Sequence, residues 1–201
     1  IVDEDDFYSY CAKKIRDLMK VFPCAEIALD AQGGGIAVME ALQDKDKIRE
    51  GEVPIYPTIE QKEKDTDHKA GLHILKLCQF AKADWLAEAN HGLRKDFEDR
   101  IVLFPYFDSV SIGLSIEDDK IANRKYDTLE DCVMEIEELK DELSMIVMTQ
   151  TSTGRERWDT PEVKVAAGKK SRLRKDRYSS LIMANMSARS LSIEKDVIEY
   201  G

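Results

Sequence analysis

The spacing of apolar residues predicts a helix, a strand, a turn and a second helix at the start of the chain. Apolar side chains recur at helical spacing over Asp6–Lys20, and Pro23 ends that pattern. Glu26–Leu29 is a short apolar run typical of a buried strand. Gln32–Gly35 is a polar, glycine-rich turn, and Ile36–Leu42 resumes the helical spacing. This order of elements indicates an α/β layer rather than a helical bundle.

The middle of the chain is more polar and less regular. Asp44–Lys69 is highly charged and contains two prolines, so we expect a long exposed loop with a short strand at Val53–Tyr56. Leu72–Phe80 is apolar and compatible with either a strand or a helix. We predict a helix over Asp84–Phe97 and a short buried strand at Ile101–Phe104.

The most regular helical stripe of the chain lies in its C-terminal half. It runs over Thr128–Ile146, begins with a capping pair formed by Thr128 and Asp131, and is assigned to packing. The other predictions for this half are an irregular link over Asp108–Tyr126, a hairpin formed by Ile146–Thr151 and Glu156–Trp158, a basic loop over Lys164–Lys175, a helix over Asp176–Arg189 and a loose tail over residues 192–201. We therefore expect a single α/β domain spanning residues 1–201.

Composition narrows the class of protein. The 201 residues are 43% hydrophobic and 35% charged, as in one globular domain. No apolar run approaches the ~20 residues of a membrane helix, so we expect no membrane contact. The four cysteines form no C-x-x-C pair and the three histidines show no ligand spacing, which argues against a zinc site. The first residue is Ile rather than Met, so we expect a piece of a larger protein.

The charge is distributed unevenly along the chain. A net charge of -10 argues against a protein that coats nucleic acid with its whole surface. Residues 155–177 nevertheless contain nine basic and four acidic residues, a net charge of +5. A basic patch on an acidic protein predicts a localised contact with phosphate groups. The basic residues are Arg155, Arg157, Lys164, Lys169, Lys170, Arg172, Arg174, Lys175 and Arg177.

Two aspartates are the candidate chemical groups. Asp30 follows the predicted strand at its carboxyl end, where open α/β sheets place their ligands. Its carboxylate either caps the next helix or binds a hard cation such as Mg²⁺, and both alternatives stay open. Asp176 lies between Lys175 and Arg177, which favour its ionised form. It is either a helix cap or surface ion-pair partner, or a metal ligand beside phosphate-binding cations.

The glycines after Asp30 do not form a nucleotide-binding motif. Gly33 and Gly35 match the first two glycines of G-x-G-x-x-G, but Val38 replaces the third. The chain also lacks the G-x-x-x-x-G-K-[ST] sequence of phosphate-binding loops. We interpret the glycines as a tight turn.

Four segments together resemble the nuclease domain of the large terminase subunit of tailed double-stranded DNA phages, an enzyme that cuts and helps package viral genomes. In the order of that family they are AEIALDAQGGGIAVMEAL, LAEANHGLRKDFEDRIVLFPY, ELSMIVMTQTSTGRERWDTPE and KKSRLRKDRYSSLIMAN. Each motif is short, but their joint order is specific. The resemblance covers most of residues 1–191.

The resemblance implies an RNase H-like fold, a mixed β-sheet flanked by helices, and metal-dependent hydrolysis of DNA. The chemistry uses two ions, Mg²⁺ or Mn²⁺, about 3.5–4 Å apart. Asp30 and Asp176 correspond to two of the acidic metal ligands. Lys175 and the Arg155–Arg157 hairpin would face DNA, and the basic segment adds Lys169, Lys170, Arg172 and Arg174 to the DNA-binding candidates. The implied partners are double-stranded DNA, the terminase ATPase domain, the small terminase subunit and the portal, in the host-cell cytoplasm during virion assembly.

One catalytic residue of the family has no match in this chain. The family's first catalytic Asp lies on an earlier strand, in the opening hairpin of the fold, and the chain lacks these N-terminal strands and the ATPase motor. We therefore expect an Mg/Mn-dependent endodeoxyribonuclease domain that is catalytically incomplete when isolated. The alternatives are a non-catalytic docking fragment of the packaging motor and another RNase H-like nuclease, such as a junction resolvase.

Overall fold

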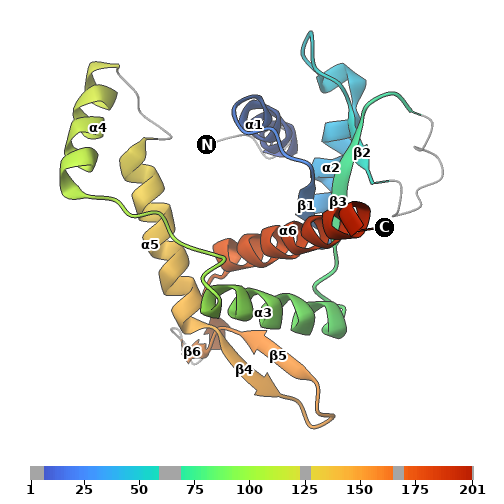
Figure 1. Cartoon of the computed structure of the whole chain (residues 1–201), viewed down its shortest axis with the longest axis vertical. Helices are drawn as coiled ribbons and strands as arrows, with labels where there is room; N and C mark the ends of the chain where they lie inside the picture. The colour runs from blue at the N-terminus through green and yellow to red at the C-terminus, as the bar shows by residue number, and fades with distance from the viewer. Residues whose placement is uncertain (1–6, 59–68, 123–127, 165–169, 201) are drawn as a thin grey trace. The chain divides into compact units, whose positions relative to one another are not determined.

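A computed structural model of the chain describes residues 7–58, 69–122, 128–164 and 170–200 (Figure 1). Its elements are α1 (Phe7–Val21), β1 (Ile27–Asp30), α2 (Gly35–Gln43), η2 (Lys45–Lys47), β2 (Ile55–Pro57), β3 (Leu72–Cys78), α3 (Ala83–Glu98), α4 (Ser109–Ile121), α5 (Leu129–Met145), β4 (Val147–Gln150), β5 (Glu156–Asp159), β6 (Glu162–Lys164), β7 (Lys170–Arg172) and α6 (Asp176–Tyr200). The prediction of an α/β protein is confirmed. Among these helices, none is long and apolar enough to cross a membrane.

The chain divides into two compact units, which are described separately. Unit 1 comprises Ile1–Trp85 with Met186–Gly201, and unit 2 comprises Leu86–Asn185. The prediction of one domain spanning residues 1–201 stays a prediction.

Unit 1 contains a three-stranded parallel sheet in the order β1-β3-β2. β1 pairs with β3 from Ile27↔Leu75 to Asp30↔Cys78, so the ambiguous apolar run is the central strand. β2 pairs with the other edge of β3. Parallel strands need a long connection, which is usually a helix. Helix α2 follows β1 and is part of such a connection. The described strands therefore do not form the mixed sheet expected of an RNase H-like fold, and their antiparallel pairs lie in the two separate hairpins.

Helices α1 and α2 supply most of the core of unit 1. α2 is apolar over most of its length and packs against β1 and β2, while α1 packs on α2. Leu42 of α2 and Leu75 of β3 are fully buried. The buried cluster consists of Ala12, Val38, Met39, Ala41, Leu42, Ile55 and Leu75.

A buried arginine ties α1 to the segment that follows α2. Arg16 donates hydrogen bonds to backbone carbonyl oxygens, including that of Leu42 at 2.6 Å. The nearby Glu52 carboxylate accepts from Arg49 Nε at 2.9 Å and lies 2.8 Å from Lys20 Nζ. Burial raises the pKa of Glu52, but the hydrogen bonds from Lys20 and Arg49 outweigh this effect and hold the pKa at about 2.

Replacing Glu52 with glutamine is expected to lower the free energy of unfolding by about 2 kcal/mol at neutral pH. Because the folded-state pKa is depressed, this stabilisation is complete above the ordinary glutamate pKa of about 4.3 and is lost as the pH falls toward about 2. Urea unfolding at a series of pH values should show parent and variant converging in acid. The control is Glu50→Gln, at an exposed position. An equal effect at Glu50, or a difference that persists at the lowest pH, would contradict the prediction.

Buried polar contacts join α3 to α6 within unit 2. The Tyr178 hydroxyl donates to Asn90 Oδ1, and Asn185 Nδ2 donates to Asp96 Oδ2 at 3.0 Å. All four residues are buried. Because buried polar side chains need hydrogen-bond partners, these contacts favour one alignment of α6 against α3 within this unit. The helix predicted over Thr128–Ile146 is confirmed as α5, and Thr128 and Asp131 form its capping box.

Two predictions for residues 101–126 are wrong. Ile101–Phe104 is not a buried strand, since it is irregular and the side chains of Ile101 and Leu103 are 69% and 73% exposed. The predicted irregular link Asp108–Tyr126 contains α4, which begins where Asp108 accepts hydrogen bonds from two backbone N–H groups. Its apolar residues lie on more than one face, so the sequence shows no single helical stripe.

Two predictions near the C-terminus also differ from the structure. The segment Lys164–Lys175, expected as a loop, includes strand β7, which pairs with β6. α6 continues to Tyr200 through residues 192–200, where we expected a loose tail. That stretch contains neither glycine nor proline, the residues that disfavour helices most strongly.

Candidate functional site

Asp30 is the last residue of β1, at the carboxyl end of the parallel sheet in unit 1. Its Oδ1 accepts a hydrogen bond from the backbone N–H of Gln32 at 2.9 Å. A carboxylate has about four lone-pair sites, so this bond leaves capacity for a cation. Cys78 pairs with Asp30 in register, but burial, with smaller charge effects, raises the pKa of its thiol to about 11. In the metal-free protein Cys78 is therefore a neutral thiol at physiological pH.

The glycine turn brings the start of α2 directly against the end of β1. Gly33 has a φ of +65°, in the left-handed region that favours glycine. A Cβ atom at Gly35 would lie 1.8 Å from the backbone oxygen of Asp30. The turn thus fixes the position of Asp30 at the carboxyl end of β1. At position 35, only glycine fits without movement of the backbone.

In unit 2, three cations of the predicted DNA-binding set converge on one carboxylate that the sequence did not single out. Asp159, at the end of β5, lies 3.0 Å from Lys175 Nζ, 3.0 Å from an Arg172 guanidinium nitrogen and 3.3 Å from one of Arg157. Burial raises the pKa of Asp159, but the hydrogen bond and charge of Lys175, with help from Arg172, lower it overall. Thr160 is fully buried beside it, accepting from Arg172 through its carbonyl oxygen at 2.7 Å.

The other predicted cations are placed differently. Arg155 is exposed in the β4–β5 hairpin, and the Arg174 side chain is 90% exposed. Lys170 is the first residue of β7. Lys169 lies outside the described residues. Arg155 and Arg174 are therefore the cations most open to a partner, while Lys175 and Arg172 are held by Asp159.

Asp176 is the first residue of α6 and its side chain is 78% exposed. One of its carboxylate oxygens lies 3.7 Å from Arg174 Nε. Asp176 belongs to unit 2 and Asp30 to unit 1.

Helix α5 anchors the start of α6 through glutamates. Glu142, which is buried, accepts a hydrogen bond from the backbone N–H of Tyr178 at 2.8 Å. Its other oxygen lies 3.2 Å from Arg177, which also pairs with Glu135 and Glu138. A carboxylate at a helix N-terminus satisfies free N–H groups and the helix dipole. The sequence signal is the spacing of the three glutamates on one side of α5, a helix whose apolar stripe we assigned to packing.

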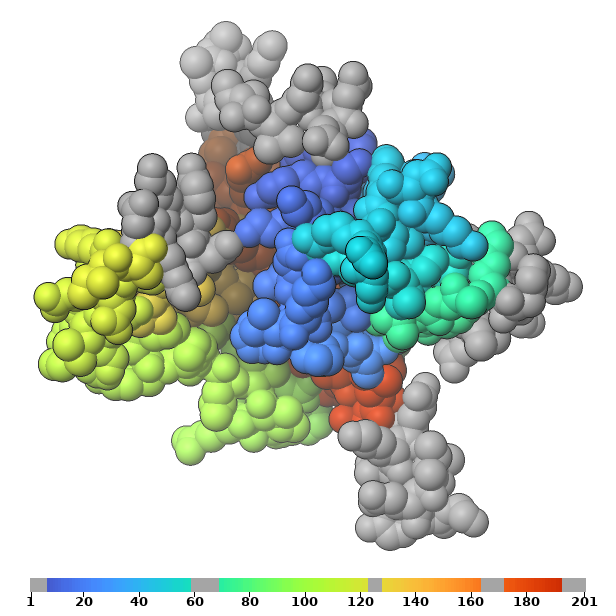
Figure 2. All heavy atoms as spheres, turned by 90° about the horizontal axis from the view of Figure 1, so that it is seen from above, coloured from blue at the N-terminus to red at the C-terminus, as the bar shows by residue number. Residues whose placement is uncertain are grey.

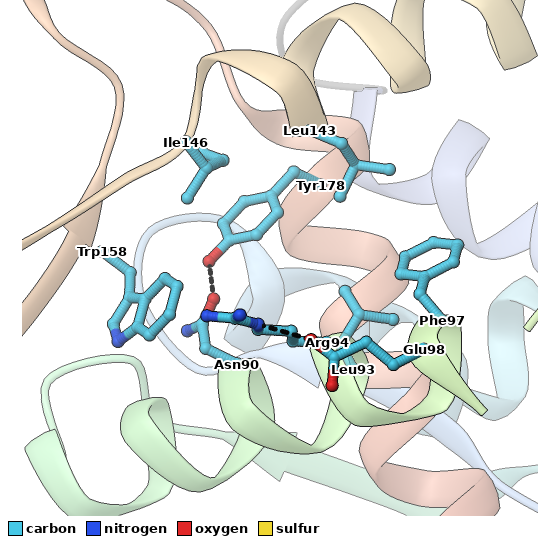
Figure 3. A pocket seen from close by; sticks show the side chains of 9 residues that line it. All are labelled: Asn90, Leu93, Arg94, Phe97, Glu98, Leu143, Ile146, Trp158 and Tyr178. Carbon is cyan, nitrogen blue, oxygen red and sulfur yellow. Dashed lines mark hydrogen bonds and ion pairs between the residues drawn. The ribbon is translucent and has the colours of Figure 1, made fainter.

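A mostly apolar cavity of about 300 Å³ lies beside this anchor in unit 2 (Figure 3). Figure 3 shows the Tyr178 hydroxyl directed at Asn90, next to the indole of Trp158. Burial raises the pKa of Tyr178 to about 12, so its hydroxyl remains a donor at physiological pH. The lining residues are Asn90, Leu93, Arg94, Phe97, Glu98, Leu143, Ile146, Trp158 and Tyr178. Because they come from four elements, the sequence pattern gives no sign of this cavity.

His91 of α3 contacts the β4–β5 hairpin at one polar cluster. Its Nε2 lies 2.8 Å from Glu156 Oε2, and Trp158 Nε1 donates to the same oxygen at 3.1 Å. The hydrogen bonds from Trp158 and then His91 hold the pKa of Glu156 below its ordinary value. The hairpin is thereby attached to α3 through Glu156, which pairs with Gln150 next to the turn of the hairpin.

Within the described ranges, no group of three or more His, Cys, Asp or Glu side chains is arranged to hold a metal ion. Asp30 and Asp176 each offer oxygen donors of the type that Mg²⁺ and Mn²⁺ prefer. Each acid therefore offers one carboxylate to such an ion, which would also need other ligands.

Comparisons of the chain with protein-family models, with curated proteins and with solved structures find no match.

Proposed function

We propose that this chain is the metal-dependent DNA endonuclease domain of a viral genome-packaging terminase, with an RNase H-like fold. The observation that carries the proposal is the position of Asp30 at the carboxyl end of a parallel strand, against a turn that requires Gly35. Ligands of open α/β sheets bind at that edge. The described strands form a parallel β1-β3-β2 sheet rather than the expected mixed sheet, so the RNase H-like fold is proposed on the resemblance alone.

Asp30 and Asp176 are the residues proposed to bind Mg²⁺ or Mn²⁺. Two such ions, when bound, activate a water molecule and stabilise the leaving oxygen of a phosphodiester. The Gln32 N–H holds one oxygen of Asp30, which orients the carboxylate. Arg174 Nε lies 3.7 Å from an oxygen of Asp176, so a cation stands beside this proposed ligand.

The proposed DNA contacts are divided between exposed cations and positioning cations. Arg155 and Arg174 are free to follow a phosphate backbone in solvent. Lys175 and Arg172 hold the two hairpins together through Asp159 and shape the basic surface. Phosphate contacts of this kind position DNA without reading its sequence. The ATPase domain, the small subunit and the portal are proposed partners on the resemblance alone.

A non-catalytic docking fragment of the packaging motor is the second candidate. One observation favours it: the Asp30 carboxylate already accepts the turn N–H of Gln32, as an aspartate with a purely structural role does. The two candidates differ in whether Asp30 binds a metal ion.

Binding of Mn²⁺, followed by electron paramagnetic resonance of the free ion, tests the proposal without requiring turnover. Asp30→Asn and Asp176→Asn are each expected to weaken binding by about tenfold or more. The matched control is Asp44→Asn, because Asp44 Oδ1 also accepts the N–H two residues ahead, from Asp46 at 3.0 Å, but lies at the end of α2. Loss in the first two variants and not in the third supports the nuclease proposal. Unchanged binding in Asp30→Asn overturns it in favour of the docking fragment.

A further inference from the structure

The α4 segment of unit 2 exposes an unusual amount of apolar surface. Val110 is 70% exposed, Leu114 is 61% exposed and Ile121 is 79% exposed. In the segment that precedes α4 along the chain, Leu103 and Tyr106 are also exposed, at 73% and 90%. Figure 2 shows α4 as yellow-green spheres at the surface of the molecule. Contiguous apolar patches of this kind mark interaction sites.

Helical geometry puts these residues in one row. Val110, Leu114 and Ile121 are separated by four and seven residues, so they share a face of α4. Glu117 lies in the same row and is exposed. A Cβ at Gly113, beside the row, would meet no atom within 4 Å, so another backbone could approach closely there. The row follows the whole helix, about 20 Å for its 13 residues.

The helix that packs against α4 is incompletely covered as well. The apolar stripe of α5 includes Leu129, Val133, Ile136 and Leu139, each of which is only partly buried. Together α4 and α5 carry ten acidic residues and two lysines, a net charge of -8. Most of the net charge of the whole chain, which is -10, therefore lies on these two helices.

The negative charge of this surface indicates which kind of partner binds the apolar row. A second copy that paired through the same face would bring an equally acidic surface against it, and nucleic acid or an anionic membrane would be repelled. We propose that the row Val110–Leu114–Ile121, with the surrounding acids, binds a cationic amphipathic helix of a partner protein. Its apolar side chains would cover the row and its Lys and Arg residues would meet Glu117 and the adjacent exposed Asp118 of α4, in the helix-to-surface mode of peptide recognition.

A designed peptide tests this surface directly. The probe is a fluorescein-labelled helix of about 18 residues containing only Lys and Leu, with Leu at helical spacing. A peptide of the same composition with scrambled order is its control. Fluorescence anisotropy on the full chain, without metal or DNA, measures binding independently of the nuclease proposal.

Two variant pairs separate the apolar and electrostatic contributions. Leu114→Ser is expected to weaken binding by about tenfold, whereas Leu18→Ser on α1, where the leucine is 59% exposed, should not. Glu117→Gln is expected to weaken binding by about threefold, and Glu98→Gln on α3 should not. Raising the salt from roughly 50 to 200 mM should weaken binding further.

Several outcomes would overturn the proposal. They are the absence of probe binding, equal binding of the scrambled peptide, and equal losses in Leu114→Ser and Leu18→Ser. A dimer in sedimentation equilibrium that Leu114→Ser dissociates would assign the row to a second copy instead. Circular dichroism of each variant confirms that the fold is retained.

Discussion

Gly35→Ala is expected to lower the free energy of unfolding by about 3 kcal/mol, one of the two largest effects that the structure predicts. The new Cβ would lie 1.8 Å from the Asp30 oxygen and 2.9 Å from its carbonyl carbon. Both atoms belong to the backbone of β1, so neither can rotate away as a side chain could. Relief of the clash requires α2 to move off β1, which exposes part of the buried cluster around Leu42.

Urea unfolding followed by circular dichroism measures the change in the free energy of unfolding. In thermal unfolding, Tm should fall by roughly 6–12 °C. The matched control is Gly113→Ala, at a helical glycine whose Cβ would meet no atom within 4 Å. That substitution should leave the stability unchanged or raise it by about 1 kcal/mol, because alanine favours helix. Equal stability of Gly35→Ala and the parent would show that α2 does not approach β1 as closely as the structure has it.

The elements that the sequence predicted well are those with strong local signals. Strand β1 lies between Pro23 and the glycine turn, and α5 has a capping pair followed by one apolar stripe. Helix α4 was missed because Ile112 and Ile116 lie on its covered side while Val110 and Leu114 lie on its exposed side. No single period describes such a helix. The pairing of β6 with β7 was missed because each strand is only three residues long and most of their side chains are charged.

The candidate site could likewise be predicted only where its residues are adjacent in sequence. The position of Asp30 could be predicted because a strand, its end and the following turn are adjacent in sequence. The role of Asp159 could not, because its cations come from β5, from β7 and from the residue before α6. The sequence showed a basic segment but not the carboxylate that organises it. It consequently assigned all these cations to DNA, whereas the structure pairs Arg172 and Lys175 with Asp159.

Asp159→Asn is expected to lower the free energy of unfolding by about 3 kcal/mol at neutral pH. Asparagine keeps the shape of the side chain but removes the charge that Arg157, Arg172 and Lys175 share, and only 15% of the Asp159 side chain is exposed. The folded-state pKa of Asp159 is depressed, so its stabilisation is complete above the ordinary aspartate pKa of about 3.9 and disappears as the pH falls below that value. Parent and variant should therefore differ at pH 7 and converge in acid.

The control for Asp159→Asn is Asp99→Asn, which removes a surface carboxylate 2.7 Å from Lys95. Exposed pairs of this kind contribute about 0–1 kcal/mol, so the control should change stability little. A second measurement separates a structural role of the cations from DNA binding. If Asp159 and its three cations face DNA, Asp159→Asn should tighten binding of a nonspecific duplex, because it removes the negative charge that the cations share. The slope of log K against log salt concentration should steepen by the equivalent of about one charge. Unchanged DNA affinity, with the loss of stability intact, would show that Asp159 and its cations only hold the hairpins together, and would leave Arg155 and Arg174 as the cations to test.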